Sequence, residues 1–259
     1  MKKRKKYNWL EALVTLAFLI ITAIVKLVIR IIFFVYDVIT IYTSKYSIKS
    51  GNGFFKTYFN IGNYGEFKLY RKVIRKFGRD KVYTNVYLDN KNTDYTEIDV
   101  IALSAYGIYV FEMKNYSGYI YGSENDEYWT QVLNKFSKRK FYNPLRQNYA
   151  HTKAVERYLE LKENETIPVI VFSNHSKLSK INVSNEKNVL QIKDVIQFIN
   201  KNSKRKEIVF SENELKEFSV KLIERSNMPQ EIKAKHIEQV TTIQKNSNFN
   251  NIDREKCFY

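Results

Sequence analysis

An uninterrupted apolar run near the N-terminus limits how the first part of this 259-residue chain can fold. Residues 12–25 contain only apolar side chains and threonines. As a helix they would extend about 21 Å, short of the roughly 30 Å hydrocarbon core of a bilayer. Continued past Lys26 and Arg30 to Tyr36, the helix is long enough, provided that these two side chains reach toward the headgroups. We therefore expect a membrane-anchor helix over about residues 10–36, with membrane lipid as its partner. A helix lying in the membrane interface is the main alternative.

The flanks of this run bear on its topology. No Gly or Pro interrupts it, and no small-x-small cleavage site follows it, so a single uncleaved pass is favoured over a hairpin or a signal peptide. Five basic residues at positions 2–6 favour a cytoplasmic N-terminus, which would export the rest of the chain. Basic residues also follow the run, so the charge rule leaves the orientation nearly undecided.

Charge and cysteine content exclude some classes of protein. The net charge is +16, of which +7 belongs to the first 50 residues, so the remaining +9 is only a weak indication of nucleic-acid binding. The hydrophobic content of 44% is enough for a packed core. The lone cysteine, Cys257, excludes a disulfide framework and a cysteine-based zinc site. The three histidines, at positions 151, 175 and 236, are too far apart in sequence to suggest a metal cluster.

Residue patterns after the anchor predict a mixed α/β domain. All eight glycines lie in residues 51–122 and all three prolines lie beyond 140, so tight turns should concentrate in the first half. We divide the chain into an anchor segment (1–50), a domain (51–205) and a C-terminal helical extension (206–259). Periodicity and capping signals predict helices at 64–77, 144–161, about 194–201, from 211 onward and at 229–243, and strands at 82–88, 98–103, 108–114, 168–172 and 189–192.

Charged side chains interrupt two strands that are otherwise apolar. On strand 108–114, a period of two places Glu112 and Lys114 on the same face. If a two-residue turn joins this strand to strand 98–103, the numbers of paired residues sum to 211 and Asp99 stands opposite Glu112. A three-residue turn with a bulge at Gly107 would shift the pairing by one, and the sequence leaves both registers open.

Two neighbouring carboxylates in an apolar sheet need a compensating cation. They repel each other and lose hydration when buried, and Mg²⁺ or Mn²⁺ suits such oxygen ligands. Lys114 beside them could orient a water molecule or offset charge on a phosphate. The alternative for these residues alone is a surface ion pair between Glu112 and Lys114 on an edge strand.

Two helices contribute further polar groups. Glu66 shares its face of helix 64–77 with Leu69, Tyr70, Val73 and Phe77. Gln147 shares its face of helix 144–161 with Ala150, Ala154 and Tyr158. Each residue alone could be an irregularity near a helix end. Together with the strand residues they form a group of inward polar side chains from several elements, which favours a functional site.

These residues resemble the nuclease-related domain (NERD) family. The resemblance covers residues 60–160, and its most specific part is the Glu-x-Lys-Asn-Tyr-x-Gly stretch. The residues that carry it are Gly65-Glu66, Thr96-Glu97-Ile98-Asp99, Gly107 to Gly118, Trp129, and Asn143-Pro144-Leu145-x-Gln147. It implies a restriction-endonuclease-like fold, with Asp99, Glu112 and Lys114 in the metal-binding and catalytic positions. Glu66 would match the family's acidic residue in the first helix and Gln147 its later polar residue. Glu97 departs from the family, which more often has Gln there.

Other candidates are interpreted as structural. His151 follows Gln147 by one helical turn and could face the site, but we expect it to be a core or surface histidine. We expect His175 and His236 to be solvated. We expect Trp129 to pack against the sheet rather than to stack on a base. A basic stretch is either a phosphate-contacting edge or an ordinary charged loop, and it comprises Lys135, Lys138, Arg139, Lys140 and Arg146.

The sequence thus predicts a membrane-anchored, metal-dependent nuclease that hydrolyses DNA, with RNA as a second candidate substrate. Asp99, Glu112 and Glu66 would hold Mg²⁺ or Mn²⁺, while Lys114 and Gln147 would position water and phosphate. The alternative is a non-catalytic adaptor of the same fold, tethered to the membrane, that binds nucleic acid or protein. A DNA substrate and the lone cysteine favour a single-pass protein of the cell membrane with its domain in the cytoplasm. The C-terminal helices extend the core or mediate assembly, and a homodimer is the assembly that we consider.

Overall fold

A computed structural model describes residues 9–90, 94–204, 207–229, 231–236, 238–239 and 241–242. It divides into two compact units, residues 1–44 and 45–259. Among the described residues of the first unit, Trp9–Thr43 form one helix, α1, which is continuous, as expected, and extends beyond the predicted end at residue 36. Its most apolar 18-residue window has a mean hydropathy of 2.7 and no buried residue, so the helix is long and apolar enough to cross a membrane.

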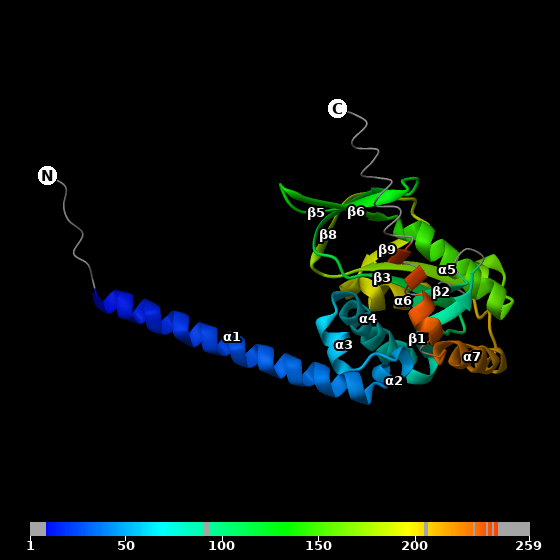
Figure 1. The fold of residues 1–259 in the computed structure, drawn as a ribbon, viewed down its shortest axis with the longest axis horizontal. Coiled ribbons are helices and arrows are strands. Elements are labelled where there is room, and N and C mark those ends of the chain that lie inside the picture. The colour runs from blue at the N-terminus through cyan, green and yellow to red at the C-terminus, as the bar shows by residue number, and fades with distance from the viewer. Residues whose placement is uncertain are drawn as a thin grey trace, which may run out of the picture. The chain divides into compact units, whose positions relative to one another are not determined.

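The second unit is a mixed α/β domain with two sheets, which confirms the predicted fold class (Figure 1). The larger sheet has the strand order β1-β2-β3-β7-β9. Pairing is antiparallel from β1 to β3 and parallel from β3 to β9. Its strands are β1 (Val82–Asp89), β2 (Tyr95–Ala102), β3 (Ile108–Lys114), β7 (Thr166–Phe172) and β9 (Asn188–Gln191). All five correspond to strands that the sequence predicted.

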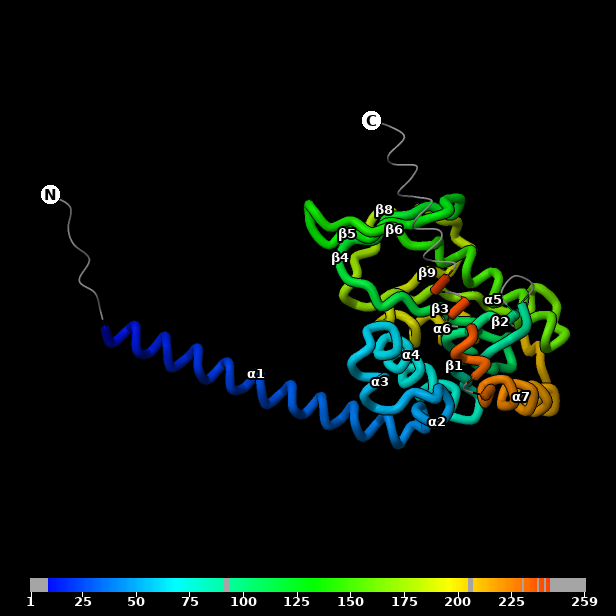
Figure 2. Tube along the Cα trace, viewed as in Figure 1, coloured from blue at the N-terminus to red at the C-terminus, as the bar shows by residue number. Residues whose placement is uncertain are grey.

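The smaller sheet was not foreseen in the sequence. Its order is β6-β5-β4-β8, with a parallel pair between β4 and β8 and antiparallel pairs elsewhere. In Figure 2, β5, β6 and β8 of this sheet lie together, apart from β1, β2 and β3 of the larger sheet. Its strands are β4 (Gly118–Ser123), β5 (Tyr128–Asn134), β6 (Ser137–Tyr142) and β8 (Ser176–Asn182).

Helices cover both faces of the larger sheet. The helices are α2 (Tyr46–Ser50), α3 (Phe54–Phe59), α4 (Ile61–Phe77), α5 (Pro144–Leu159), α6 (Val195–Ser203) and α7 (Glu212–Ser226), with 3₁₀ turns at Arg79–Lys81, Glu163–Glu165 and Ile192–Asp194. On one face, Tyr109 of β3 contacts Phe77 of α4 and Phe198 of α6. On the other, α5 and α7 close the core.

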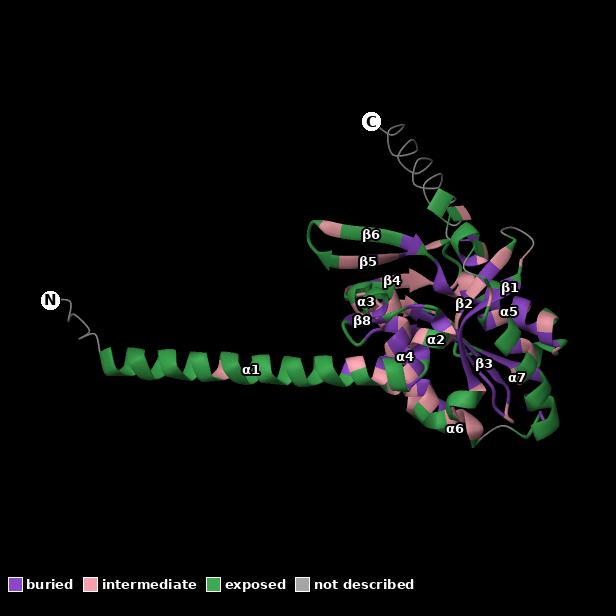
Figure 3. Cartoon of the chain, turned by 60° about the horizontal axis from the view of Figure 1, so that its bottom comes forward, coloured by how far each residue is buried: buried purple, intermediate pink, exposed green. Residues whose placement is uncertain are grey.

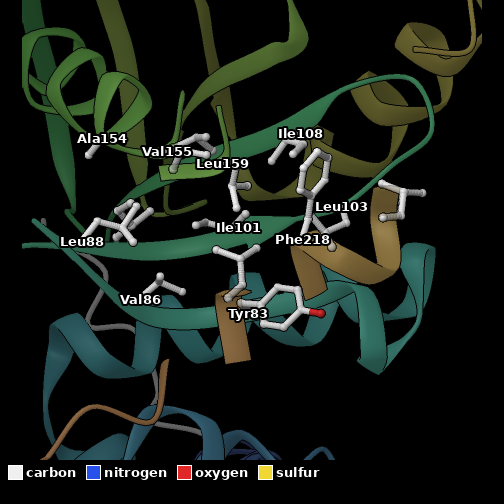
Figure 4. Close-up of a cluster of buried hydrophobic side chains, with 14 of the residues drawn as sticks. Tyr83, Val86, Leu88, Ile101, Leu103, Ile108, Ala154, Val155, Leu159 and Phe218 are labelled. Atoms are coloured by element: carbon white, nitrogen blue, oxygen red, sulfur yellow. The ribbon is translucent and has the colours of Figure 1, made fainter. Parts of the chain in front are cut away.

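One side of the core joins α5 and α7 to β1, β2 and β3. Figure 4 shows Val155 and Leu159 of α5 and Phe218 of α7 gathered around the strand residues. Figure 3 shows the same distribution, with the central strands buried and the outer helix surfaces exposed. Because Phe210, Leu215 and Leu222 are buried in this cluster, the C-terminal extension completes the core.

Local signals in the sequence set the helix boundaries. Asn143 caps α5 by accepting a hydrogen bond from the Leu145 amide, and Pro144 occupies the first turn. Ser211 and Glu214 form a reciprocal capping box that begins α7. Both features confirm the predicted helix starts. Of the predicted helix 229–243, positions 230, 237, 240 and 243 lie outside the described residues, and the described residues from 231 onward are helical.

Candidate functional site

The candidate site lies where β2 and β3 separate. Their ladder pairs Ala102 with Tyr109, Ile101 with Val110 and Val100 with Phe111, so paired numbers sum to 211, the register of a two-residue turn. Beyond the last pair, the side chain of Asp99 replaces a ladder partner: its Oδ2 accepts a hydrogen bond of 2.7 Å from the Met113 amide. Asp99 is thereby held beside the neighbouring strand residue Glu112.

An irregularity in β1 and β2 orients Asp99. Asn85 of β1, whose register places it opposite Asp99, has φ +52°, in the left-handed region that Asn tolerates better than most residues. Ile98 and Ile101 both belong to the same core cluster although they are three residues apart, so the alternation of faces is broken between them. The Thr84 hydroxyl donates to the Asp99 carbonyl (2.8 Å), which fixes the backbone at the break.

Glu112 and Lys114 project from β3 toward α5, as the period of two predicted. The Lys114 ammonium donates to Glu112 Oε1 at 2.6 Å and to Gln147 Oε1 at 2.9 Å. The Glu112 side chain is 2% exposed and that of Lys114 15%, so this is a buried ion pair rather than the surface pair considered as an alternative. Lys114 has three N–H donors and therefore keeps one for another ligand.

His151 also belongs to this group. Its Nδ1 lies 3.2 Å from Glu112 Oε2, and its side chain is 6% exposed. His151 is therefore a buried core histidine, as expected, and it also faces the site, which the sequence had left open. Gln147 and His151 are four residues apart and so project from the same side of α5. Ala150, which we placed on that inward side, is instead exposed.

α5 is fixed against β3 by a buried amide. Asn148 Nδ2 donates to the Val110 carbonyl (3.1 Å), and at its N-terminus Asn143 Nδ2 donates to the carbonyls of Ser123, Glu124 and Asp126. These bonds define the position of the helix along the strand. The register of Gln147 and His151 against Glu112 and Lys114 follows from them.

Glu66 reaches the site from α4. At Gly65 an added Cβ would lie 2.5 Å from Asn115 Cβ, so only glycine allows α4 to approach the end of β3 this closely. Asn115 Nδ2 donates to the Ile61 carbonyl, which ties the first turn of α4 to the same strand end. The Gly65-Glu66 pair and the Asn after Lys114 therefore act together to place the Glu66 carboxylate.

The carboxyl groups have opposite electrostatic environments. Burial, together with the charges of Glu97 and Glu112, raises the pKa of Glu66 to about 8. Burial and the charges of Glu112 and Glu66 raise the pKa of Asp99 well above its ordinary value. Burial would also raise the pKa of Glu112, but Lys114 and His151 outweigh it and lower the pKa to about 2. Only Glu112 is thus kept ionised by its protein neighbours.

The carboxylate oxygens of the site suit a cation, but they are not arranged as a preformed metal site. Oε2 of Glu66 is buried and accepts no hydrogen bond from the described residues, and the buried Oε2 of Glu112 has only His151 Nδ1 beside it, at 3.2 Å. Carboxylate oxygens left in this way suit a hard divalent cation. In the part of the chain that the structure describes, no three His, Cys, Asp or Glu side chains converge as a preformed ligand group. Glu66, Asp99 and Glu112 therefore fit a metal by type and burial, and their side chains would have to close around it.

The segment after α7 also approaches the site. The backbone is helical at residues 231–236, 238–239 and 241–242. The His236 ring packs edge-on against Tyr87 at 5.6 Å, and the Lys233 ammonium lies 5.6 Å from the centre of the same ring. Tyr87 pairs with Glu97 across the β1–β2 ladder.

His236 is not solvated, contrary to our expectation. It is 8% exposed, and its Nδ1 is buried with no hydrogen-bond partner among the described residues. Burial, only partly offset by Glu97 and reinforced by His151, lowers its pKa. Burial likewise lowers the pKa of Lys233, against the attraction of Glu97. The sequence did not single out either residue, because its patterns predicted a helix after α7 but not which part of the domain that helix packs against.

Glu97 joins these two groups. Asn85 Nδ2 donates to Glu97 Oε1, and the charge of Glu97 acts on Glu66, Lys233 and His236. Glu97 thus connects the Glu66 side of the site to the C-terminal segment.

The remaining candidates are resolved by their surroundings. Trp129 is fully buried, stacks on Phe172 at 6.2 Å and donates to the Ser123 carbonyl, so its predicted packing role is confirmed. His175 is exposed, as expected. The basic stretch lies on the β5–β6 hairpin and the first turn of α5, and Lys135, Lys138, Arg139, Lys140 and Arg146 are all exposed.

A buried Asp, Glu and Lys at diverging strands, with polar groups from two flanking helices, define a candidate site of the nuclease type. The model of the nuclease-related domain family matches residues 61–173. An uncharacterized protein of Bacillus anthracis is 32% identical over 179 residues, which cover 68% of this chain and 82% of that protein. The chain belongs to the nuclease-related domain family. No solved structure gives a significant match to it.

Proposed function

We propose that this protein is a membrane-attached nuclease that hydrolyses DNA phosphodiester bonds with Mg²⁺ or Mn²⁺. The observation that supports the proposal is the cluster of Asp99, Glu112 and Lys114 with Glu66 and Gln147, in which the buried Glu66 Oε2 accepts no hydrogen bond from the described residues and Glu112 Oε2 has only the His151 ring beside it. Family membership supports a nuclease-related role, and the exposed apolar helix α1 is compatible with membrane attachment. A restriction-endonuclease-like fold remains our prediction.

Asp99, Glu112 and Glu66 would hold the cation through their carboxylates. When bound, the cation would stabilise the negative charge that develops on the phosphate. Lys114, whose third N–H is not used by Glu112 or Gln147, would orient the attacking water. The amide nitrogen of Gln147 would donate to a phosphate oxygen. Attack of water on phosphorus breaks one P–O bond and leaves one hydroxyl and one phosphate monoester.

Calorimetric titration with Mn²⁺ tests the metal site directly. We expect full-length protein in detergent micelles to bind Mn²⁺, and we expect Asp99→Asn and Glu112→Gln to abolish binding. Glu217→Gln on the exposed side of α7 is a matched control that should bind as the wild type does. No binding, or binding equal in all four proteins, would argue against the enzyme and favour the non-catalytic adaptor.

We propose further that the domain faces the cytoplasm, where chromosomal DNA is present. Protease protection of residues 45–259 in sealed inside-out and right-side-out membrane vesicles tests this topology. Digestion only in inside-out vesicles is the expected result. Protection in inside-out vesicles would place the domain outside the cell and exclude chromosomal DNA as its substrate. A homodimer remains a prediction that cross-linking in membranes can test.

A further inference from the structure

Large apolar side chains are exposed on the 45–259 unit in the segment that directly follows α1. Phe55 is 75% exposed, Phe59 70% and Ile61 74%. The rings of Phe55 and Phe59 stack at 6.1 Å with an interplanar angle of 8°. We refer to these three residues as the aromatic face. Single exposed apolar residues are normal on a soluble protein, but a stacked pair of exposed rings followed at once by a further exposed apolar residue suits an interaction surface.

The aromatic face is built into the fold. Phe54 and Thr57, on the opposite side of α3, are buried, and the Thr57 hydroxyl donates to the Asn52 carbonyl. Asn63 Nδ2 of α4 donates to the Lys56 carbonyl of α3, which joins the two helices. With one side of α3 anchored, Phe55 and Phe59 have no route into the core. The fold therefore keeps them on the surface.

Charge around the aromatic face suits an anionic surface. No Asp or Glu occurs between Asp37 and Glu66, whereas the segment contains three lysines. Lys49 is used within the fold, where it donates to the carbonyls of Arg79 and Val82. Lys45 and Lys56 are exposed. Exposed Phe side chains accompanied by basic residues are typical of segments that lie in the membrane interface.

Chain length brings the aromatic face within reach of the membrane. α1 ends at Thr43 and α3 begins at Phe54. Eleven residues span at most about 38 Å when fully extended, and the helical turn α2 shortens this distance. A second copy of the chain is a poorer occupant. Three large side chains would bury on the order of 450 Å², below the roughly 800 Å² per partner of a stable interface.

We propose that the aromatic face inserts into the headgroup region of the membrane that α1 is proposed to cross, as a second lipid contact of the domain. The inference rests on the membrane attachment proposed above and is independent of nuclease activity. It has a consequence for the candidate site. Glu66 follows Ile61 by five residues on α4, about 7.5 Å along the helix axis, so the carboxylate cluster would work close to the membrane surface.

Quenching of tryptophan fluorescence by brominated lipids tests this contact. The full chain is reconstituted in vesicles of phosphatidylcholine and phosphatidylglycerol, with Trp9→Phe as the background. Trp129 remains, and because it is fully buried it provides a constant signal. Phe59→Trp in this background places a reporter on the aromatic face without removing an aromatic ring. Phe136→Trp is the matched control, because Phe136 is 97% exposed on the β5–β6 hairpin.

The proposal predicts that the tryptophan at position 59 shifts to shorter emission wavelength and loses emission with brominated lipid, while the one at position 136 does neither. Subtracting the fluorescence of Trp9→Phe from that of the wild type gives the emission of Trp9, which reports insertion of α1. Quenching of Trp9 without quenching at position 59 overturns the proposal. Absence of both overturns membrane attachment as well. A blue-shifted but unquenched signal at position 59, with a cross-linked dimer, overturns the proposal in favour of a second copy.

Discussion

Replacing Glu66 with glutamine removes a carboxyl group whose ionisation the fold opposes. The pKa of Glu66 is about 8 in the folded protein, against an ordinary value of 4.5, because burial and the charges of Glu97 and Glu112 favour its protonated form. An acid with a raised pKa stabilises the fold fully below pH 4.5, and this stabilisation is lost as the pH rises toward 8. Glutamine is neutral throughout and should not show the loss.

The size of the effect follows from the pKa. At about 1.36 kcal/mol per pH unit, the interval from 4.5 to about 8 corresponds to roughly 5 kcal/mol of unfolding free energy. Glu66 is partly exposed and shares its charge with its neighbours, so solvent screening lowers the expected value to about 2 kcal/mol. We expect Glu66→Gln to match the wild type near pH 5 and to be about 2 kcal/mol more stable at pH 8.5.

Urea unfolding of the full chain in detergent micelles at pH 5 and pH 8.5 measures this difference. In a Trp9→Phe background, the buried indole of Trp129 reports unfolding of the domain. Glu217→Gln, an exposed carboxyl on α7, serves as the control and should leave both values unchanged. If Glu66→Gln and the wild type lose equal amounts of stability between the two pH values, the fold does not oppose ionisation of Glu66, and our electrostatic account of the site is wrong.

Three further substitutions test the supports of the site. Gly65→Ala should cost about 1–3 kcal/mol and weaken Mn²⁺ binding, because the new methyl group meets Asn115; calorimetry and urea unfolding measure both. Gly122→Ala should cost a similar amount without changing Mn²⁺ binding, because it displaces the ring of Trp129, away from the carboxylates; equal loss of binding would contradict this. His151→Phe should raise the pKa of Glu112, because it removes a neighbour that lowers this pKa. The wild type loses the stability contributed by Glu112 as the pH falls from about 4.5 to 2, and the variant should lose it at higher pH. Acid unfolding curves of the two proteins that superimpose would contradict this prediction.

Local patterns predicted the larger sheet and the placement of the principal site residues. The alternation in β3 placed Glu112 and Lys114 on the same face, and the two-residue turn gave the observed register with β2. The cap at Asn143 and the period of α5 directed Gln147 inward. These features depend on neighbours within a few residues, which is why the sequence alone could specify them.

Long-range pairing could not be predicted in this way. β4 pairs with β8, although more than 50 residues separate them, and the exposed, lysine-rich β6 shows no clear alternation. The left-handed conformation of Asn85 and the break of alternation at Asp99 arise from the two strands together. The burial of His236 was missed because nothing in the sequence indicates that the helix after α7 packs against Tyr87.

Cleavage of DNA by the full chain is the measurement that tests the central claim most directly. Supercoiled plasmid is incubated with the detergent-solubilised protein in Mg²⁺, in Mn²⁺ and in EDTA, alongside Lys114→Met and the surface control Glu217→Gln. The account predicts nicking or linearisation with either metal, none in EDTA, and loss of cleavage in Lys114→Met while its Mn²⁺ binding persists. No cleavage by the wild type in either metal, or equal cleavage by Lys114→Met, would contradict it.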